Sequence, residues 1–248
     1  FYIASLITAI AFVLIPADNN AASQPTSQEL EENALLLQAA VDEVERCREL
    51  DMLVPSFHNI ISIAALDFHA ATMMANMKPV DYLIFFAYTR QGNYAPLRIA
   101  AFNGLVLMRG LQHKIIARYL FAVLRSDESS VVKRALARAI LESLAVAIAC
   151  NEFGELKPRS SLYLEGDPAA AYQAETTRER DLENVLRSLR KEVGRSAAIR
   201  EGFMAALLSQ SVDSEARWAL LKLAELLFKP AAESDLPFLP KVSVRMRM

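Results

Sequence analysis

Histidine is the residue type in this sequence with the clearest potential for metal chemistry. The three histidines are His58, His69 and His113. Zinc peptidases place two histidines four positions apart on one helix, in the pattern HExxH, so that both reach the same metal ion. That pattern is absent here, and His58 and His69 would lie about 16 Å apart along a helix axis. We therefore expect no metal site.

The sequence also lacks the residues that other common catalytic sites require. Cys47 and Cys150 lie in apolar helical patterns without a CxxC spacing, so we expect reduced, buried thiols, with a disulfide or metal pair as the alternative. The 7 glycines are scattered and form no phosphate-binding loop. No serine or cysteine occupies a nucleophile elbow. We expect no catalysis, no cofactor and no small-molecule substrate.

Basic residues recur in a short helical motif. Arg98, Lys133 and Arg217 each follow an apolar residue and precede an alanine by two positions. The preceding residues are Leu97, Val132 and Ala216, and the following ones are Ala100, Ala135 and Ala219. The first two copies are about 35 residues apart and the third follows after about twice 42, near the HEAT and armadillo period of about 40–47.

Such a repeat predicts helix pairs that bury their apolar faces only by stacking on their neighbours. We therefore expect an all-α, HEAT/armadillo-like solenoid. The bases Arg98, Lys133, Arg134 and Arg217 are expected to pair with acids or carbonyls of the adjacent repeat, and a ligand-binding surface is the alternative. Asp127, Glu142 and Asp213 are the candidate acidic partners.

Composition agrees with a helical protein that has no strong attraction to nucleic acid. Hydrophobic residues make up 53% of 248 positions, and the formal net charge is −2. The apolar run from Tyr2 to Ile15 is shorter than the ~20 residues that span a membrane. We expect a buried helix there and no membrane partner.

The predicted organisation is one helical unit over residues 1–229 and an extended arm over 230–248. Polar and proline-containing stretches predict a mobile loop at about 16–28 and an irregular insertion at about 151–170. We expect a helix from Pro55 onwards and another, short and very apolar, over Val80–Thr89.

Two surface features complete the list of candidates. Arg187, Arg190 and Lys191 are spaced to share a helix face, which is either solvated or in contact with DNA or an acidic partner. In the arm, Val242, Val244 and Met246 alternate with polar residues, which is typical of a half-buried strand. We expect this strand to add to the edge of a sheet elsewhere, with an unpaired tail as the alternative.

The stretch from Glu49 to Leu107 carries a family resemblance. Its recognisable residues are Asp51, Pro55, Ser56 and Asn59 at a helix entry, the Lys78-Pro79 turn, and Gly92, Asn93, Tyr94 and Arg98–Ala101. This stretch resembles the C-terminal HEAT-like region of the subunit 2 family of the general transcription factor TFIID, a family of TBP-associated factors.

The resemblance implies a nuclear, non-enzymatic scaffold in transcription initiation. Family members carry an aminopeptidase-like part with degenerate metal chemistry before the repeats. Implied partners are other TBP-associated factors, notably the eighth with the tenth, and the first, with promoter DNA reached through the intact complex. The C-terminal helical domain of an active zinc aminopeptidase and a HEAT-repeat transport adaptor are the alternatives.

Overall fold

The computed structural model is all-helical across its described residues, 1–15, 27–108, 110–149, 187, 190, 191 and 196–228. Its helices are α1 (Tyr2–Leu14), α2 (Ser27–Leu53), α3 (Ile60–Met74), α4 (Leu83–Phe86), α5 (Ala95–Leu107), α6 (Lys114–Ser126), α7 (Ser130–Ala149), α9 (Ala197–Leu207) and α10 (Ser214–Leu227), with a 3₁₀ turn η1 (Phe57–Asn59). The predicted insertion and the arm lie outside the described residues.

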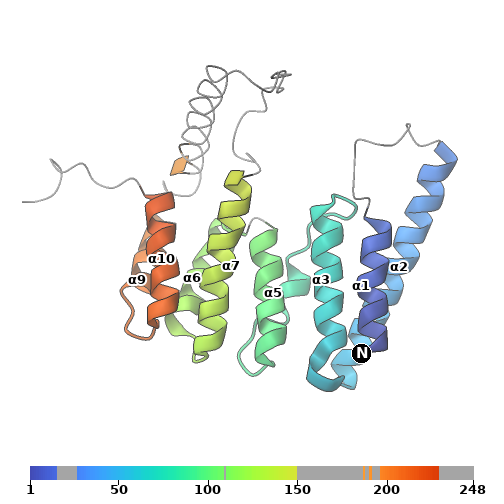
Figure 1. Cartoon of the computed structure of the whole chain (residues 1–248), viewed down its shortest axis with the longest axis horizontal. Coiled ribbons are helices and arrows are strands. Elements are labelled where there is room, and N and C mark those ends of the chain that lie inside the picture. The colour runs from blue at the N-terminus through green and yellow to red at the C-terminus, as the bar shows by residue number, and fades with distance from the viewer. Residues whose placement is uncertain (16–26, 109, 150–186, 188–189, 192–195, 229–248) are drawn as a thin grey trace, which may run out of the picture.

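The helices form two layers that run side by side along the molecule (Figure 1). One layer consists of α1, α3, α5, α7 and α10, each in contact with the next. The other layer contains α2, α4, α6 and α9, of which α6 and α9 pack against each other. Helices from the two layers alternate along most of the chain, which is the arrangement of a solenoid. The prediction of an α-solenoid is confirmed.

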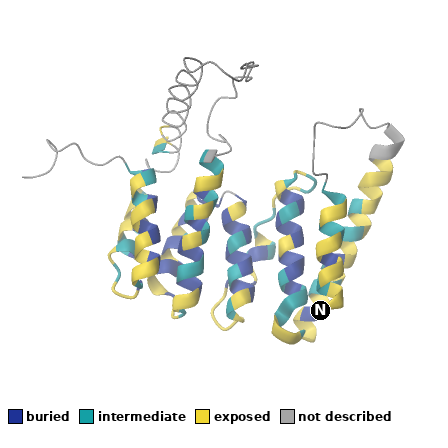
Figure 2. Cartoon of the chain, viewed as in Figure 1, coloured by how far each residue is buried: buried dark blue, intermediate teal, exposed yellow. Residues whose placement is uncertain are grey.

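A continuous apolar core lies between the two layers. Figure 2 shows the buried residues on the faces where the layers meet. Phe102 of α5 and Phe121 of α6 are 1% and 0% exposed, and the Phe121 ring meets Phe203 of α9 edge-on, with 5.6 Å between centroids. A smaller cluster around Ile7, Val44 and Phe68 joins α1, α2 and α3. Each helix is therefore held by its neighbours.

The recurring motif falls on successive helices of one layer. Arg98, Lys133 and Arg217 are the fourth residues of α5, α7 and α10. The apolar residues before them are buried, and of the alanines after them two are buried and one, Ala135, is half-buried. The sequence repeat thus corresponds to a structural repeat, because each copy occupies the same position in its helix.

Two predicted helices are shorter than expected. The structure limits the Val80–Thr89 helix to Leu83–Phe86, and the amide of Tyr88 donates to the carbonyl of Phe85, three residues earlier. This tighter turn accompanies the burial of both aromatic rings, at 0% and 5% exposure. α2 begins at Ser27, at the end of the loop predicted for about 16–28, and residues 16–26 lie outside the described residues.

The helix expected from Pro55 begins later, at Ile60, after two residues with positive φ. His58 has φ 56° and Asn59 has φ 52°. The carboxylate of Asp51 fixes this turn by accepting from the Ser56 amide at 2.6 Å and the Ser62 amide at 2.9 Å. Burial alone would raise the pKa of Asp51, but the hydrogen bonds from Ser62 and Ser56 lower it overall. The left-handed pair costs backbone energy, which these bonds offset.

Candidate functional site

Arg98 joins the turns that precede α5 and α7, at the lower end of the stack in Figure 1. Its Nε donates to the carbonyl of Thr89 at 3.1 Å, and its two terminal nitrogens donate to the two carboxylate oxygens of Asp127. The side chains are only 5% and 3% exposed. Asp127 also accepts from the amide of Ser129 at 2.9 Å, at the start of α7. One buried ion pair therefore connects two consecutive repeats.

The electrostatics of Asp127 reflect this double use. Burial raises the pKa of the carboxyl, but the hydrogen bonds from Arg98 and from the Ser129 amide outweigh burial, and the pKa is lowered overall. Asp127 is therefore charged at neutral pH and neutralises the buried guanidinium of Arg98.

Lys133 makes a similar connection to the next helix of the layer, whereas Arg217 contacts only the turn before its own helix. The Nζ of Lys133, which is 3% exposed, donates to the carbonyl of Ser211 in the turn before α10. Arg217 donates to the carbonyls of Ser209 at 3.0 Å and Val212 at 3.2 Å in its own turn. All three motif bases thus bind turn carbonyls or a turn carboxylate. Arg98 and Lys133 therefore each contact the turn before the next helix of their layer, while the contacts of Arg217 stay in the turn before its own helix.

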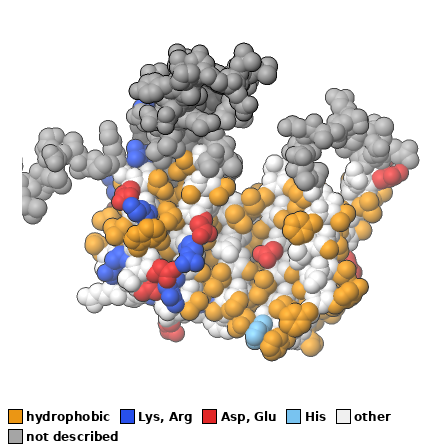
Figure 3. Space-filling model, in the orientation of Figure 1, with side chains coloured by type: hydrophobic (Ala, Val, Ile, Leu, Met, Phe, Trp, Pro, Cys, Tyr) orange, Lys and Arg blue, Asp and Glu red, His pale blue; other side chains and the backbone are white. Residues whose placement is uncertain are grey.

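Arg134 and Arg138 form a second, exposed set of contacts between α7 and α10. Arg134 lies 3.2 Å from Asp213 and 3.5 Å from Glu215, and Arg138 also pairs with Glu215. Figure 3 shows charged side chains gathered at this end of the face, while hydrophobic side chains cover much of the remainder. Exposed pairs of this kind contribute little stability. Glu142, a candidate acidic partner, is exposed and has no ion pair within the described residues.

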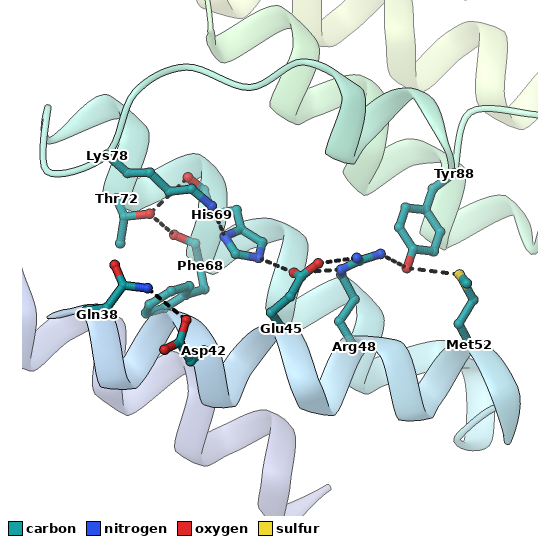
Figure 4. Close-up of polar contacts among 10 residues, drawn as sticks. All are labelled: Gln38, Asp42, Glu45, Arg48, Met52, Phe68, His69, Thr72, Lys78 and Tyr88. Atoms are coloured by element: carbon teal, nitrogen blue, oxygen red, sulfur yellow. Dashed lines mark hydrogen bonds and ion pairs between the residues drawn. The ribbon is translucent and has the colours of Figure 1, made fainter. Parts of the chain in front are cut away.

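A partly buried polar network connects α2 with α3 and with the segment after α4 (Figure 4). Glu45 of α2 pairs with Arg48 one turn later, and its other contact is His69 Nε2 of α3 at 3.1 Å. Arg48 donates to the hydroxyl of Tyr88 at 2.6 Å, and the Lys78 ammonium lies 3.4 Å from His69 Nδ1. The network ties three consecutive elements of both layers together.

His69 is neutral within this network. Its side chain is 0% exposed, and burial lowers its pKa to about 4, reinforced by the charge of Lys78 and opposed by Glu45. The neighbours assign the proton: Nε2–H donates to the Glu45 carboxylate, and Nδ1 accepts from Lys78. A histidine that bonds through both nitrogens has none left for a metal or a substrate.

The other histidines lie on the surface. His58 stacks on Phe57, with 3.8 Å between ring centroids, and lies 5.3 Å from the ring of Tyr94. His113 meets the edge of Tyr82 at 5.0 Å. No group of three His, Cys, Asp or Glu side chains in the described part of the chain could hold a metal ion. Cys47 is a free, half-buried thiol on α2, and Cys150 lies outside the described residues.

Large apolar side chains are exposed at several places that sequence reasoning did not single out. The turn between α2 and α3 presents Leu53 at 76%, Val54 at 79% and Phe57 at 68% exposure. Trp218 on α10 is 58% exposed. Contiguous exposed apolar surface is typical of sites that contact other proteins. The surface of the stack therefore carries exposed apolar side chains that could contact other proteins. The buried polar groups form hydrogen bonds within the fold.

Comparison with known proteins supplies the family. The model of the family described as "TAF2-like, TPR repeats" matches residues 1–153, which span α1 to α7. The chain belongs to this family. Tetratricopeptide and HEAT repeats are both stacked helix pairs, and the spacing of about 35 between Arg98 and Lys133 is close to the TPR period of 34.

A curated relative extends the similarity of this TAF2-like chain beyond α7. The chain is 25% identical over 237 residues to "Transcription initiation factor TFIID subunit 2" of Schizosaccharomyces pombe, covering 92% of the chain and 19% of that protein. The chain therefore spans about a fifth of the length of the curated relative that it matches. No solved structure matches.

The remaining predicted site residues of the TAF2-like chain differ in their contacts and exposure. Arg190 donates to the carbonyls of Leu226 at 3.1 Å and Glu225 at 3.4 Å, so it caps the C-terminal end of α10. Arg187 and Lys191 are exposed. Val242, Val244 and Met246 lie outside the described residues. None of the described helices has the length and hydropathy that a membrane crossing requires.

Proposed function

We propose that this chain is a non-enzymatic scaffold region of a TFIID subunit, acting in the nucleus during transcription initiation by RNA polymerase II. Family membership over residues 1–153 supports a TFIID-related role, and the relative from fission yeast carries that name over most of the present chain. The scaffold supports assembly of the complex and, through it, engagement of core-promoter DNA.

The observation that carries this proposal is the stacked two-layer architecture with its polar groups used internally. The motif bases bind turns of the same fold, and His69 bonds through both ring nitrogens. The stack also presents large apolar side chains outward, as at Leu53 and Trp218. Surfaces of this composition suit protein partners better than DNA phosphates, which attract clustered basic side chains.

The identity of the partners and the division of the chain rest on the sequence. The family resemblance proposes the TBP-associated factors numbered eight, with ten, and one. The chain is proposed to consist of repeats over 1–229 and an arm over 230–248, whose alternating Val242–Met248 segment adds to a sheet edge elsewhere. Deleting Lys241–Met248 should then weaken partner binding without lowering the melting temperature.

The central test compares a buried and an exposed position on one helix in the intact protein. Leu136 of α7 is 1% exposed, whereas Val146 of the same helix is 58% exposed. A carboxylate at Leu136 (Leu136→Asp) should disrupt the stack and release the other TFIID subunits from an affinity-purified complex, while Val146→Asp should leave the stack folded. Recovery of no TBP-associated factor with the unaltered protein, or full recovery with Leu136→Asp, would refute the proposal.

A further inference from the structure

A groove of about 340 Å³ lies between α6 and α9, on the layer opposite α7 and α10. Its floor is apolar and built from small side chains over the buried ring of Phe121, including Ala122 and Gly202. A Cβ placed on Gly202 would lie 3.6 Å from Phe121, which is ordinary contact. The depression exists because alanine and glycine leave space where larger residues would fill it.

The two walls of the groove run in the same direction. Ser211, which follows α9, donates to the carbonyl of Arg125 at the end of α6 at 2.6 Å. Along α6, the exposed residues Ile115, Arg118, Ala122 and Arg125 are spaced by three or four positions and so follow one stripe. Ile115 is 83% exposed and extends the apolar surface beyond the groove. The groove is therefore elongated along the helices, as a bound chain segment requires.

The rim of the groove carries positive charge that the described part of the chain does not neutralise. Arg118 and Arg125 line it and make no side-chain ion pair with any described residue, and Glu201 is the one acid among the lining residues. Arg98, Arg134 and Arg138, by contrast, all have carboxylate partners. The seven-residue separation places Arg118 and Arg125 about 10 Å apart along the helix axis.

We propose that this groove binds a segment of a partner subunit that carries two carboxylates about two helical turns apart with an apolar side chain between them. The carboxylates pair with Arg118 and Arg125, and the apolar side chain fills the space over Phe121. The identification of the partner as a TFIID subunit rests on the proposed function. The predicted pattern of two carboxylates and one apolar side chain in the segment depends only on the residues that line the groove.

Site-specific photocrosslinking in the intact complex tests this proposal. Ala122 is replaced by p-benzoylphenylalanine, and Ala145, an exposed residue of α7, receives the same probe as a control. Mass spectrometry should find Ala122 joined to another subunit at a segment with Asp or Glu seven positions apart. Crosslinks to nucleic acid, to residues 150–186 of the same chain, to a segment without that acidic spacing, or to nothing would overturn the proposal.

Charge reversal tests the role of the arginines. Arg118→Glu with Arg125→Glu should reduce the Ala122 crosslink at least about tenfold at low salt, since two attractive contacts become repulsive, and added salt should shrink the difference. Arg90→Glu, an exposed arginine without a described partner, should leave the crosslink unchanged. Equal loss in both variants would overturn the assignment.

The two proposals can fail separately. If no TBP-associated factor is recovered but Ala122 crosslinks to an acidic segment of another protein, the proposed function is refuted and the groove proposal is supported. Recovery of TFIID subunits without any crosslink from Ala122 would support the proposed function and refute the groove proposal.

Discussion

Replacing Asp127 by alanine should destabilise the fold more than any exposed charge replacement, because Asp127 both neutralises Arg98 and accepts from the Ser129 amide in the turn before α7. The guanidinium of Arg98 is 5% exposed, so without Asp127 it remains a buried charge whose one described acceptor is the carbonyl of Thr89. Breaking a buried ion pair from one side costs about 3–5 kcal/mol. Loss of the acceptor for the Ser129 amide, in the turn between α6 and α7, adds about 1 kcal/mol.

A double-mutant cycle separates these two contributions. Arg98→Met removes the buried charge while keeping an apolar stem of similar length. In the Arg98→Met background, Asp127→Ala should therefore cost only about 1 kcal/mol, for the lost hydrogen bond from the Ser129 amide. The coupling energy between the two positions should be about 3–5 kcal/mol, measured as the difference between the two costs.

Urea unfolding followed by circular dichroism measures these free energies, with Arg138→Ala as the exposed control. The pH dependence gives a second readout. Because the folded pKa of Asp127 is lowered, its contribution is complete above the unfolded value of about 3.9 and disappears as pH falls through the folded value. A coupling energy under about 0.5 kcal/mol, or an acid transition unchanged by Asp127→Ala, would refute the reasoning.

Three further predictions concern other parts of the stack. Lowering the pH from about 7 to about 4 should reduce the free energy of unfolding by up to about 3 kcal/mol, because the pKa of His69 is lowered to about 4 in the folded protein. In urea titrations, His69→Gln should remove this pH dependence of the free energy of unfolding, whereas His58→Gln should not. Gly104→Ala should lower the melting temperature, since a Cβ there lies 2.2 Å from the Phe85 ring and overpacking costs about 1–3 kcal/mol, whereas Gly202→Ala should raise it slightly. Arg138→Ala should change unfolding free energy by less than about 1 kcal/mol, and less still in high salt.

The repeat architecture could be predicted because its cause is local. Each motif copy combines an apolar residue, a base and a small residue at fixed spacing, and each occupies the same position in α5, α7 and α10. Sequence reasoning also named Asp127 and Asp213 as acidic partners, and the structure places them against Arg98 and Arg134. Acids at helix starts are conspicuous in a sequence, so these partners could be proposed from the turns that they begin.

The network around His69 could not be predicted in the same way. Its members Glu45, Arg48, His69 and Tyr88 come from three elements, and nothing in the spacing of 24 residues between Glu45 and His69 marks them as neighbours. One signal was present: His69 directly follows Phe68 on a helix that is apolar on most sides, where a polar ring needs buried partners. That signal predicts that His69 has a buried hydrogen-bond partner, but it does not identify the partner. The way α2 packs on α3 determines which acidic side chain lies next to His69.

The groove between α6 and α9 could not be predicted from the sequence either. Alanine and glycine are ordinary helix residues, and Ala122 and Gly202 are separated by 80 positions that include residues outside the described part. Only the packing of α6 on α9 brings them together in one groove with Arg118 and Arg125, which make no ion pair with a described residue. In a solenoid the stabilising contacts repeat from unit to unit, so they leave a periodic trace in the sequence. A binding surface departs from that repeat, and such departures become recognisable only when the helices are placed side by side.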